Sequence, residues 1–335
     1  MNRKQYVSVD GVSSDVADVL SGVPQGTVLG PILFVIYIND LLDGIKSDGV
    51  LYADDTKIFN TITSKNDAVD LQSDITKLEK WADEWMMKFH PGKCHVLTLG
   101  KFEDIKHAHQ YKVTNHDIEH VDVEKDLGII IDEEMTFEEH ICTKVRIANA
   151  LVGNIRRAFT FLDGQVLKKL YTSLVRPHLE YGQAIWSPFL MKYIDKIERV
   201  QERATKLING YGNLSYTERL KLLDLPTLRF RRLRGDLIEM YKHFYTYDKN
   251  ALTGPSFNVR QRSSRKHKHQ VNEAFLARRR GLRENSFYGR VARAWNSLPR
   301  DVAESKDINT FKNNLDRYLD NHPMKWNHRW RDEEI

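Results

Sequence analysis

Residues 50–59, VLYADDTKIF, place two adjacent aspartates between two short runs of strand-forming residues. The runs at 50–53 and 56–59 predict the two strands of a β-hairpin. Asp54 and Asp55 would then lie at its tip, fixed in position by the strands. Two carboxylates offer the hard oxygen ligands that Mg²⁺ prefers, which makes this tip a candidate metal site. A solvated Asp-Asp turn gives the same pattern, because aspartate is common in turns.

The sequence upstream of the aspartates predicts a hairpin, a loop and a helix. Residues 5–9 alternate apolar and polar side chains and end at Asp10-Gly11, a pair typical of hairpin turns. Residues 21–26, SGVPQG, form a glycine- and proline-containing loop. The apolar stretch at 28–42 is too long for an ordinary strand, so it predicts a buried helix.

Downstream of the aspartates the pattern becomes mainly helical. Apolar residues at 68–85 recur at helical spacing, and His90-Pro91-Gly92 is expected to end this helix. Thr136 and Glu139 have the spacing of a capping box at the start of a long helix that reaches Phe159. Strands are also expected at 94–99 and 127–131, and further helices at 165–175, 190–209 and 228–245.

Several motifs together resemble the reverse transcriptases of non-LTR retrotransposons. YADD at 52–55, after an apolar strand, is similar to the catalytic signature of these enzymes. SGVPQGTVLGP at 21–31 resembles their template- and nucleotide-positioning segment. Further similarities are the W..EW.M.F...KC pattern at 81–94, LGIIID at 127–132, AIWSP at 184–188 and WNSLP at 295–299. The chain is identified as a member of this family over nearly its whole length.

This resemblance implies an α+β fold and a polymerase reaction. It implies an incomplete reverse-transcriptase palm at 1–135, a mainly helical thumb-like region at 136–247, and a basic linker with a C-terminal helical region at 248–335. The implied reaction is RNA-templated DNA synthesis from dNTPs, with an RNA template and a DNA primer as partners. Asp54 and Asp55 would hold catalytic Mg²⁺, with Mn²⁺ able to substitute.

The resemblance also assigns roles to four other residues. Gln25 and Gly26 would lie against the template and the incoming nucleotide, where a side chain at position 26 would obstruct close approach. Tyr52 would pack beside the metal site. Lys93 would reach the phosphates, although an ordinary exposed turn lysine fits the same pattern.

The chain departs from the family at its start. The family's metal site needs another aspartate, on a strand before the Gly-Val-Pro-Gln-Gly segment, and fingers that hold the nucleotide. This chain begins at what resembles the sequence just after that strand, and Asp10, Asp15 and Asp18 are expected to be solvated residues near turns. We therefore expect inefficient polymerisation by this chain alone, because an error of about 1 Å can cost about 100-fold in rate. The alternatives are a non-catalytic remnant that binds RNA or DNA, and a fragment of a degenerate element.

Positive charge is concentrated near the C-terminus. The chain has 51 Lys and Arg against 46 Asp and Glu, a formal charge of +5. Residues 256–300 hold twelve basic and two acidic residues, so this segment carries +10 and the rest of the chain −5. Aromatic residues lie among these cations, a pattern that favours nucleic-acid binding over a merely solvated basic face. The candidate binding residues are Lys266, Lys268, Arg278, Arg279 and Arg280.

Other features limit the class of protein. The longest apolar run, at 32–38, is far shorter than the roughly 20 residues that span a bilayer, so no membrane association is expected. Two cysteines favour a reducing, intracellular compartment, without distinguishing nucleus from cytoplasm. Trp81 and Trp85 are expected to belong to the core rather than to a base-stacking surface. Four histidines have metal-like spacing but no nearby cysteine, so zinc is not expected: His107, His109, His116 and His120.

Overall fold

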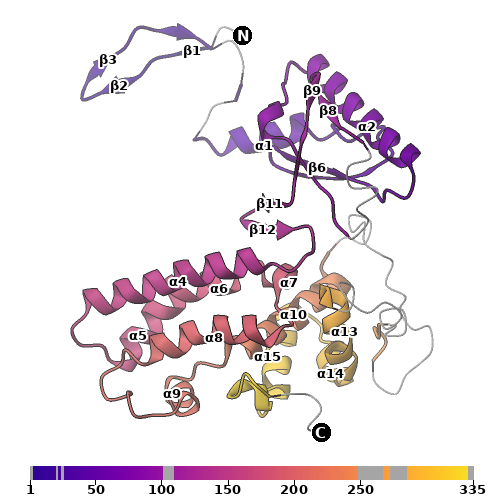
Figure 1. Ribbon diagram of the computed structural model, residues 1–335. Helices are drawn as coiled ribbons and strands as arrows, with labels where there is room; N and C mark the ends of the chain where they lie inside the picture. Colours follow the sequence, from indigo (N-terminus) through magenta and orange to yellow (C-terminus); the bar gives the residue numbers. More distant parts are fainter. Residues whose placement is uncertain are drawn as a thin grey trace. The chain divides into compact units, whose positions relative to one another are not determined.

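The chain forms two compact units, and its fold is mixed α+β as expected (Figure 1). The computed structural model describes residues 3–19, 22–23, 26–100, 109–247, 267–271 and 285–330. The first unit comprises Met1–Val96 and Phe102–Val121, and the second Leu97–Lys101 and Asp122–Ile335. Among the described residues, no helix combines the length and the apolar character that a membrane crossing requires.

The first unit begins with the predicted hairpin. Its strands are β1 (Lys4–Gln5), β2 (Ser8–Val9), β3 (Val12–Ser13) and β4 (Ala17–Asp18). β2 pairs with β3 around Asp10-Gly11, whose φ angles of 50° and 83° are those that a two-residue hairpin turn requires. β1 pairs with β4, so the hairpin extends over residues 4–18. Asp10, Asp15 and Asp18 are all exposed, in agreement with the prediction.

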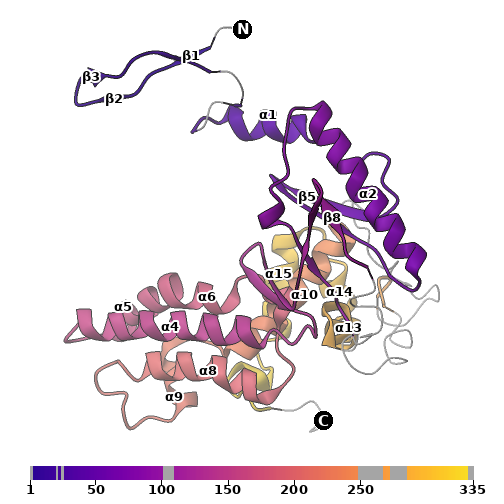
Figure 2. The ribbon, with the colours of Figure 1, turned by 45° about the horizontal axis from the view of Figure 1, so that its top comes forward.

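A long helix and short strands form the rest of this unit (Figure 2). α2 packs its apolar face against the β8–β9 hairpin, in a core of Ala68, Tyr111, Val113 and Ile118. The elements are α1 (Leu29–Tyr37), β5 (Asp48–Tyr52), β6 (Asp55–Phe59), α2 (Lys65–Glu84), the 3₁₀ turn η1 (Pro91–Lys93), β7 (His95–Leu97), β8 (Lys112–Val113), β9 (His116–Asp117) and β10 (Glu119–Val121).

Two predictions for this unit need correction. α1 forms where a helix was predicted, but Gly30 is its one buried residue, and Ile36 is 67% exposed. A helix that is apolar on every side needs protein on every side, and the described residues that pack against α1 leave most of it uncovered. α2 ends at Glu84, before the predicted Pro91 region, because Met86 takes a φ of 55° and the Met87 N–H bonds back to the Ala82 carbonyl at 2.7 Å.

The second unit is mainly helical and has two connected apolar cores. Helices over 190–209 and 228–245 were predicted, and α8 and α10 confirm them. The elements are β11 (Val123–Asp126), β12 (Ile129–Asp132), α4 (Glu138–Ala158), α5 (Gly164–Leu170), the π-helical turn η2 (Tyr171–Val175), α6 (Arg176–Glu180), α7 (Gln183–Trp186), α8 (Met191–Thr205), α9 (Tyr216–Leu223), α10 (Leu228–Tyr245), α13 (Phe287–Ser297), α14 (Arg300–Ala303), α15 (Ile308–Tyr318) and the 3₁₀ turn η3 (Pro323–Lys325).

The start of α4 differs from the predicted capping box. Its N-cap is Phe137, with a φ of 56° and no side-chain cap. The carboxylate of Asp132, at the end of β12, accepts hydrogen bonds from the N–H groups of Thr136 at 2.9 Å and Phe137 at 2.6 Å. The Thr136 hydroxyl accepts from the Glu138 N–H at 3.3 Å, so the predicted Thr136–Glu139 box forms only in part, and a side chain from the preceding strand satisfies the neighbouring backbone donors.

His140 connects α4 to its neighbours in the second unit. The side chain is fully buried, and its ring lies 5.1 Å from the Trp186 ring. Its Nδ1 accepts a hydrogen bond from the Ile130 N–H at 3.1 Å, so the folded state holds a neutral imidazole there. Burial, reinforced by the nearby Lys144 charge, lowers the pKa of His140 to about 4.

We predict that the second unit loses stability as the pH falls from about 6.5 towards 4. The unfolded chain takes up a proton on His140 near pH 6.5, whereas the folded chain does so near its pKa of about 4. The expected loss in the free energy of unfolding approaches about 3 kcal/mol. Urea unfolding of the chain and of His140→Gln at pH 7.5, 5.5 and 4.5 tests this. The variant should show the weaker pH dependence, and parallel curves would contradict the assignment.

Candidate metal site

The two aspartates lie at the end of the β5–β6 hairpin. Tyr52 pairs with Asp55, so the two-residue turn is Ala53-Asp54, and Asp55 is the first residue of β6 rather than part of the turn. Ala53 has a φ of 51°, in the left-handed region that usually requires glycine. A non-glycine residue in this conformation costs about 1–2 kcal/mol, which the paired strands must offset.

The candidate ligands face solvent. Asp54 and Asp55 are exposed, and Tyr52 is 63% exposed. Because Tyr52 and Asp55 are directly opposite each other in the ladder, their side chains project from the same face of the hairpin. The arrangement presents carboxylate oxygens on a short, fully paired hairpin, where a substrate can reach them.

A buried carboxylate fixes the start of this hairpin to α2. Asp74 of α2 is fully buried and accepts hydrogen bonds from the N–H groups of Lys46 at 3.0 Å and Ser47 at 2.8 Å, just before β5. The Lys77 ammonium donates to the same carboxylate at 2.8 Å. Burial by itself would raise the pKa of Asp74, but the hydrogen bonds from Lys77, Ser47 and Lys46 lower it to about 2.

Sequence reasoning missed Asp74, although a signal for it exists. Asp74 follows Leu71 by three positions and precedes Leu78 by four, so it lies within the apolar stripe of the predicted helix. A carboxylate on a buried face needs hydrogen-bond partners, and such a residue therefore marks a structural tie. Lys77, three residues later, is a partner that the sequence shows, but the other two partners are the backbone N–H groups of Lys46 and Ser47, which no side-chain pattern reveals.

The pair of tryptophans, Trp81 and Trp85, joins α1 to α2. The Trp81 and Trp85 rings stack at 5.7 Å, and the Tyr37 ring packs edge-on against Trp85 at 5.0 Å. The Trp81 indole N–H donates to Asp40 at 3.1 Å. Trp81 is half-buried and Trp85 is 39% exposed, so the predicted core position is only partly realised.

The other predicted ligand-binding residues are Gln25, Gly26 and Lys93. Gln25 lies outside the described residues. Gly26 has a φ of 74° and open space where a Cβ would project, so backbone conformation favours glycine there. Lys93 is exposed at the end of η1. Among the described residues, no hydrogen bond or ion pair connects Gly26 or Lys93 to the aspartates.

The described residues contain no group of three His, Cys, Asp or Glu side chains that could hold a metal ion. Asp54 and Asp55 alone fit Mg²⁺ as a shared site, because this ion commonly binds through one or two carboxylates together with substrate phosphates. They do not form a closed, all-protein cage. The chemistry of the donors therefore favours a metal that arrives with a phosphate ligand.

Of the five predicted nucleic-acid-binding residues, the structure describes Lys268. Lys266, Arg278, Arg279 and Arg280 lie outside the described residues. Lys268 is exposed, and its backbone N–H donates to Glu304 at 2.9 Å. Residues 267–270 belong to the predicted basic linker, yet they pack against α13, since the Trp295 indole N–H donates to the His269 carbonyl at 2.8 Å.

One cation of the basic segment has a structural role. Arg290 in α13 forms an ion pair with Asp236 of α10 at 2.9 Å and donates to the Ala184 carbonyl at 2.7 Å. Asp236 is buried and its other oxygen accepts a second bond from Arg290 at 3.0 Å. The charge of Arg290 is therefore used to join α13, α10 and α7.

The hairpin geometry and the sequence motifs correspond to a known class of protein. Residues 2–131 match the family described as Reverse transcriptase (RNA-dependent DNA polymerase). This segment, which contains both aspartates, is therefore part of a reverse transcriptase domain.

The relatives narrow this class. The chain is 30% identical over 224 residues to the RNA-directed DNA polymerase from mobile element jockey of Drosophila funebris, covering 62% of this chain and 24% of the relative. It is 26% identical over 223 residues to the probable RNA-directed DNA polymerase from transposon X-element of Drosophila melanogaster, covering 62% and 24%. It is 25% identical over 262 residues to the retrovirus-related Pol polyprotein from type-1 retrotransposable element R1 of Bradysia coprophila, covering 74% and 26%.

The chain therefore carries a reverse transcriptase domain, and it is similar to the RNA-directed DNA polymerases of non-LTR retrotransposons. It spans about a quarter of the length of these relatives. No solved structure matches it.

We predict that Asp74→Asn lowers the free energy of unfolding of the first unit by about 2 kcal/mol at pH 7, because the ionised carboxylate is stabilised in the folded state. This stabilisation is present above the ordinary pKa of 3.8 and is lost as the pH falls towards about 2. Urea unfolding measures the change, and hydrogen exchange of the Lys46 and Ser47 amides reports the local tie.

Asp70→Asn is the matched control. Asp70 lies one turn earlier on α2 and pairs with the side chain of Lys46 at 3.1 Å on an exposed surface, a type of contact worth less than about 1 kcal/mol. Equal destabilisation by both variants, or unchanged exchange at Lys46 and Ser47 in Asp74→Asn, would show that Asp74 does not anchor the hairpin.

Proposed function

We propose that this chain carries two of the metal-binding carboxylates of an RNA-templated DNA polymerase. The observation that carries the proposal is the Asp54-Asp55 hairpin, exposed at its tip and anchored at its base, within the segment that matches the reverse transcriptase family. Bound Mg²⁺ or Mn²⁺ would activate the primer 3′-hydroxyl and neutralise the triphosphate of the dNTP.

The surrounding residues take supporting roles in this proposal. Tyr52 shares the exposed face of Asp55 and packs beside the metal. Gln25 and Gly26 lie against the RNA template and the incoming dNTP, and the positive φ of Gly26 lets the backbone make that turn. Lys93, exposed and cationic, reaches the phosphates of the nucleotide or the primer.

The proposed division of the chain follows the resemblance. Residues 1–135 form part of the palm, residues 136–247 form a thumb-like helical region, and residues 248–335 form a basic C-terminal region. The helices from Glu138 to Tyr245 support the thumb-like helical region, whereas β11 and β12, proposed as part of the palm, belong to the second unit. A DNA primer on an RNA template is the proposed substrate.

We propose further that the 335-residue chain by itself polymerises inefficiently. The described residues offer the metal no third acidic ligand beside Asp54 and Asp55. Loss of a ligand leaves the metal loosely positioned, and misplacement by about 1 Å can cost about 100-fold in rate. Efficient activity would need a further carboxylate beside Asp54 and Asp55 and a surface that holds the nucleotide.

A primer-extension assay on an RNA template with Mg²⁺ or Mn²⁺ tests this proposal. We predict that the chain extends the primer no faster than Asp54→Asn, because two carboxylates alone do not fix the metal. Asp48→Asn is the matched control, since Asp48 is an exposed aspartate at the opposite end of the same hairpin, paired with Phe59.

The outcomes separate the two parts of the proposal. Robust extension that is lost in Asp54→Asn and kept in Asp48→Asn would overturn the predicted inefficiency and support the metal role. Robust extension that persists in Asp54→Asn and Asp55→Asn would overturn the metal role itself.

A further inference from the structure

α8 carries a straight line of positive charge on its solvent face. Its cations follow one another at spacings of four, three, four and three residues, so at 3.6 residues per turn they lie within an arc of about 80°. With a rise of 1.5 Å per residue, the line is about 21 Å long. We call these residues the α8 cation strip: Lys192, Lys196, Arg199, Arg203 and Lys206, all of which are exposed.

The opposite face of α8 is fixed in the core, which holds the strip outward. Ile197 and Val200 are at most 1% exposed and belong to the main apolar cluster of the second unit. α8 packs along α4, and three contacts tie the strip to it. Lys192 pairs with Glu138 at 3.9 Å, Lys196 Nζ lies 2.9 Å from Cys142 Sγ, and Arg203 donates to Asn149 at 3.1 Å.

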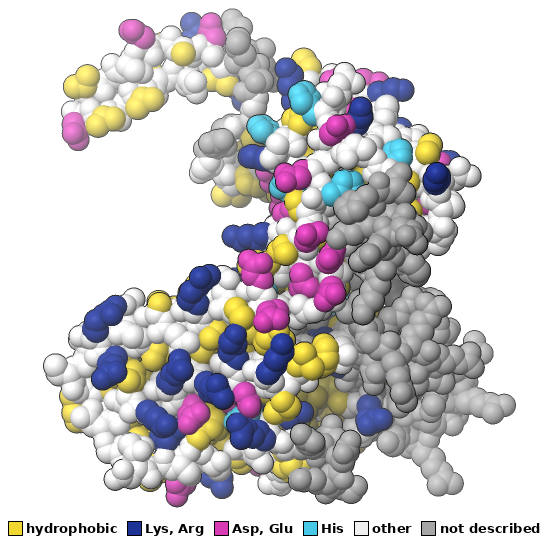
Figure 3. Space-filling model, viewed as in Figure 1, with side chains coloured by type: hydrophobic (Ala, Val, Ile, Leu, Met, Phe, Trp, Pro, Cys, Tyr) yellow, Lys and Arg dark blue, Asp and Glu magenta, His cyan; other side chains and the backbone are white. Residues whose placement is uncertain are grey.

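α4, the helix that packs along α8, carries further exposed positive charge. The contact positions advance together along both helices, so α4 and α8 run in the same direction. Arg146, Arg156 and Arg157 of α4 are exposed. Figure 3 shows Lys and Arg side chains gathered over these two helices on the face in view.

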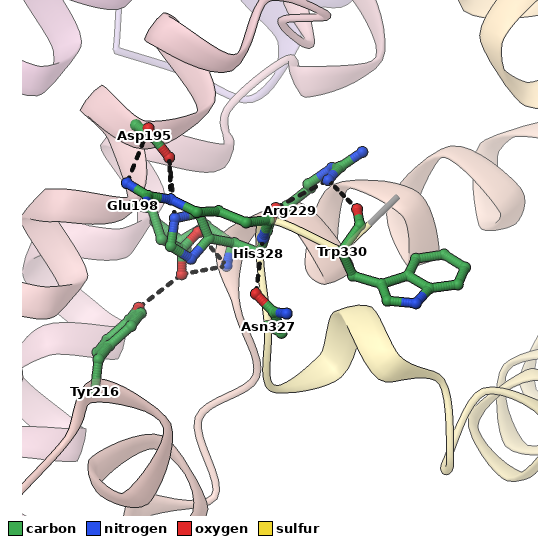
Figure 4. Close-up of polar contacts among 9 residues, drawn as sticks. Asp195, Glu198, Tyr216, Arg229, Asn327, His328 and Trp330 are labelled. Carbon is green, nitrogen blue, oxygen red and sulfur yellow. Dashed lines mark hydrogen bonds and ion pairs between the residues drawn. The ribbon is translucent and has the colours of Figure 1, made fainter. Parts of the chain in front are cut away.

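The acidic residues that flank the strip are already engaged. Asp195 accepts from His328 at 3.0 Å and from Arg329 at 3.2 Å, both from the C-terminal segment (Figure 4). The same segment is held in place by Arg229, which donates to the carbonyl of Trp330 at 2.7 Å. The second flanking acid, Glu202, lies 3.4 Å from Lys206 and 3.9 Å from Arg219.

The middle of the strip therefore keeps its charge for a partner. In the part of the chain that the structure describes, no ion pair holds Lys196, Arg199 or Arg203. Lys196 hydrogen-bonds the Cys142 thiol and lies near the Glu138 carboxylate, which pairs with Lys192, and Arg203 hydrogen-bonds the Asn149 amide.

We infer that the α8 cation strip is a docking surface for the phosphodiester backbone of a nucleic acid. A line of cations held at regular spacing on a rigid helix matches a line of phosphates, and each neutralised phosphate releases bound counterions. Protein interfaces, by contrast, centre on buried aromatic and apolar anchors, which the outward face of α8 does not supply. This inference rests on the proposed function only for the class of partner, because the strip shares no residue with the Asp54-Asp55 hairpin or with residues 256–300.

Fluorescence anisotropy of labelled oligonucleotides tests the strip in the full chain, with EDTA present so that no metal contributes. The probes are a 20-nucleotide single-stranded RNA, an RNA–DNA duplex and a DNA duplex, each titrated at several salt concentrations. The test variant combines Lys196→Gln, Arg199→Gln and Arg203→Gln. We expect at least tenfold weaker binding, and a salt dependence of log K that is shallower by about 2 for single-stranded RNA and by nearly 3 for a duplex.

Two triple variants serve as controls. Lys169→Gln, Lys221→Gln and Lys306→Gln remove the same charge from exposed positions outside the strip, and we expect less than threefold weakening. Lys196→Arg, Arg199→Lys and Arg203→Lys keep the charge, and we expect affinity within about twofold of the original. Equal weakening by the strip triple and the outside triple, or no effect of the strip triple, would overturn the inference.

The free thiol of Cys142 gives a local readout that does not depend on affinity changes. Cys142 is half-buried beside Lys196, whereas Cys94 belongs to the first unit. Saturating RNA should slow the reaction of N-ethylmaleimide with Cys142 at least fivefold and change the Cys94 rate less. Unchanged Cys142 reactivity under saturation would contradict docking at the strip.

Two further experiments distinguish nucleic-acid docking at the strip from general binding of acidic polymers and from binding at the Asp54-Asp55 site. Poly-glutamate should not displace RNA at equal charge concentration, and equal displacement would identify the strip as a general acidic-polymer surface instead. Asp54→Asn should bind the oligonucleotides as the original chain does. The strip triple variant should in turn keep the Mn²⁺ binding expected at Asp54 and Asp55. Loss of oligonucleotide binding with Mn²⁺ binding kept, or the reverse, would therefore assign the failure to one site alone.

Discussion

The hydrogen bonds between Asp74 and the residues just before β5 fix the position of the hairpin that carries the candidate metal site. The Asp74 carboxylate accepts two backbone N–H groups and the Lys77 ammonium inside the unit, which lowers its pKa to about 2. The β5–β6 hairpin is only five residue pairs long, and a short isolated hairpin is marginally stable in water. Fixing its base to α2 is what allows a strained Ala53 turn to hold Asp54 and Asp55 at its end.

The sequence predicted the elements whose pattern is local. The alternation around Asp10-Gly11 predicted a hairpin, and the apolar spacing in 228–245 predicted α10. Both signals depend only on residues close together in the sequence. The hairpin that carries Asp54 and Asp55 was likewise confirmed, although Asp55 lies in β6 rather than in the turn. Their roles as metal ligands stay a prediction.

The predictions that the structure corrects depended on partners that the local sequence pattern does not show. The apolar composition of α1 shows that it needs cover, but which protein supplies that cover is not a property of residues 28–42, and Ile36 is exposed. Asp132 supplements Thr136 at the start of α4, because the chain after β12 brings the Thr136 and Phe137 N–H groups to its carboxylate. The α8 cation strip needed the structure, since Asp195, one of the two acids beside it, pairs with His328 and Arg329, more than one hundred positions away.

The central claim is that Asp54 and Asp55 act together as part of a metal site, and Mn²⁺ binding tests it most directly. Electron paramagnetic resonance of Mn²⁺ titrated into the chain, Asp54→Asn, Asp55→Asn and Asp48→Asn measures the bound fraction in each. The account predicts one weak site that is lost in both hairpin-tip variants and kept in Asp48→Asn. Identical Mn²⁺ binding by all four proteins would contradict it.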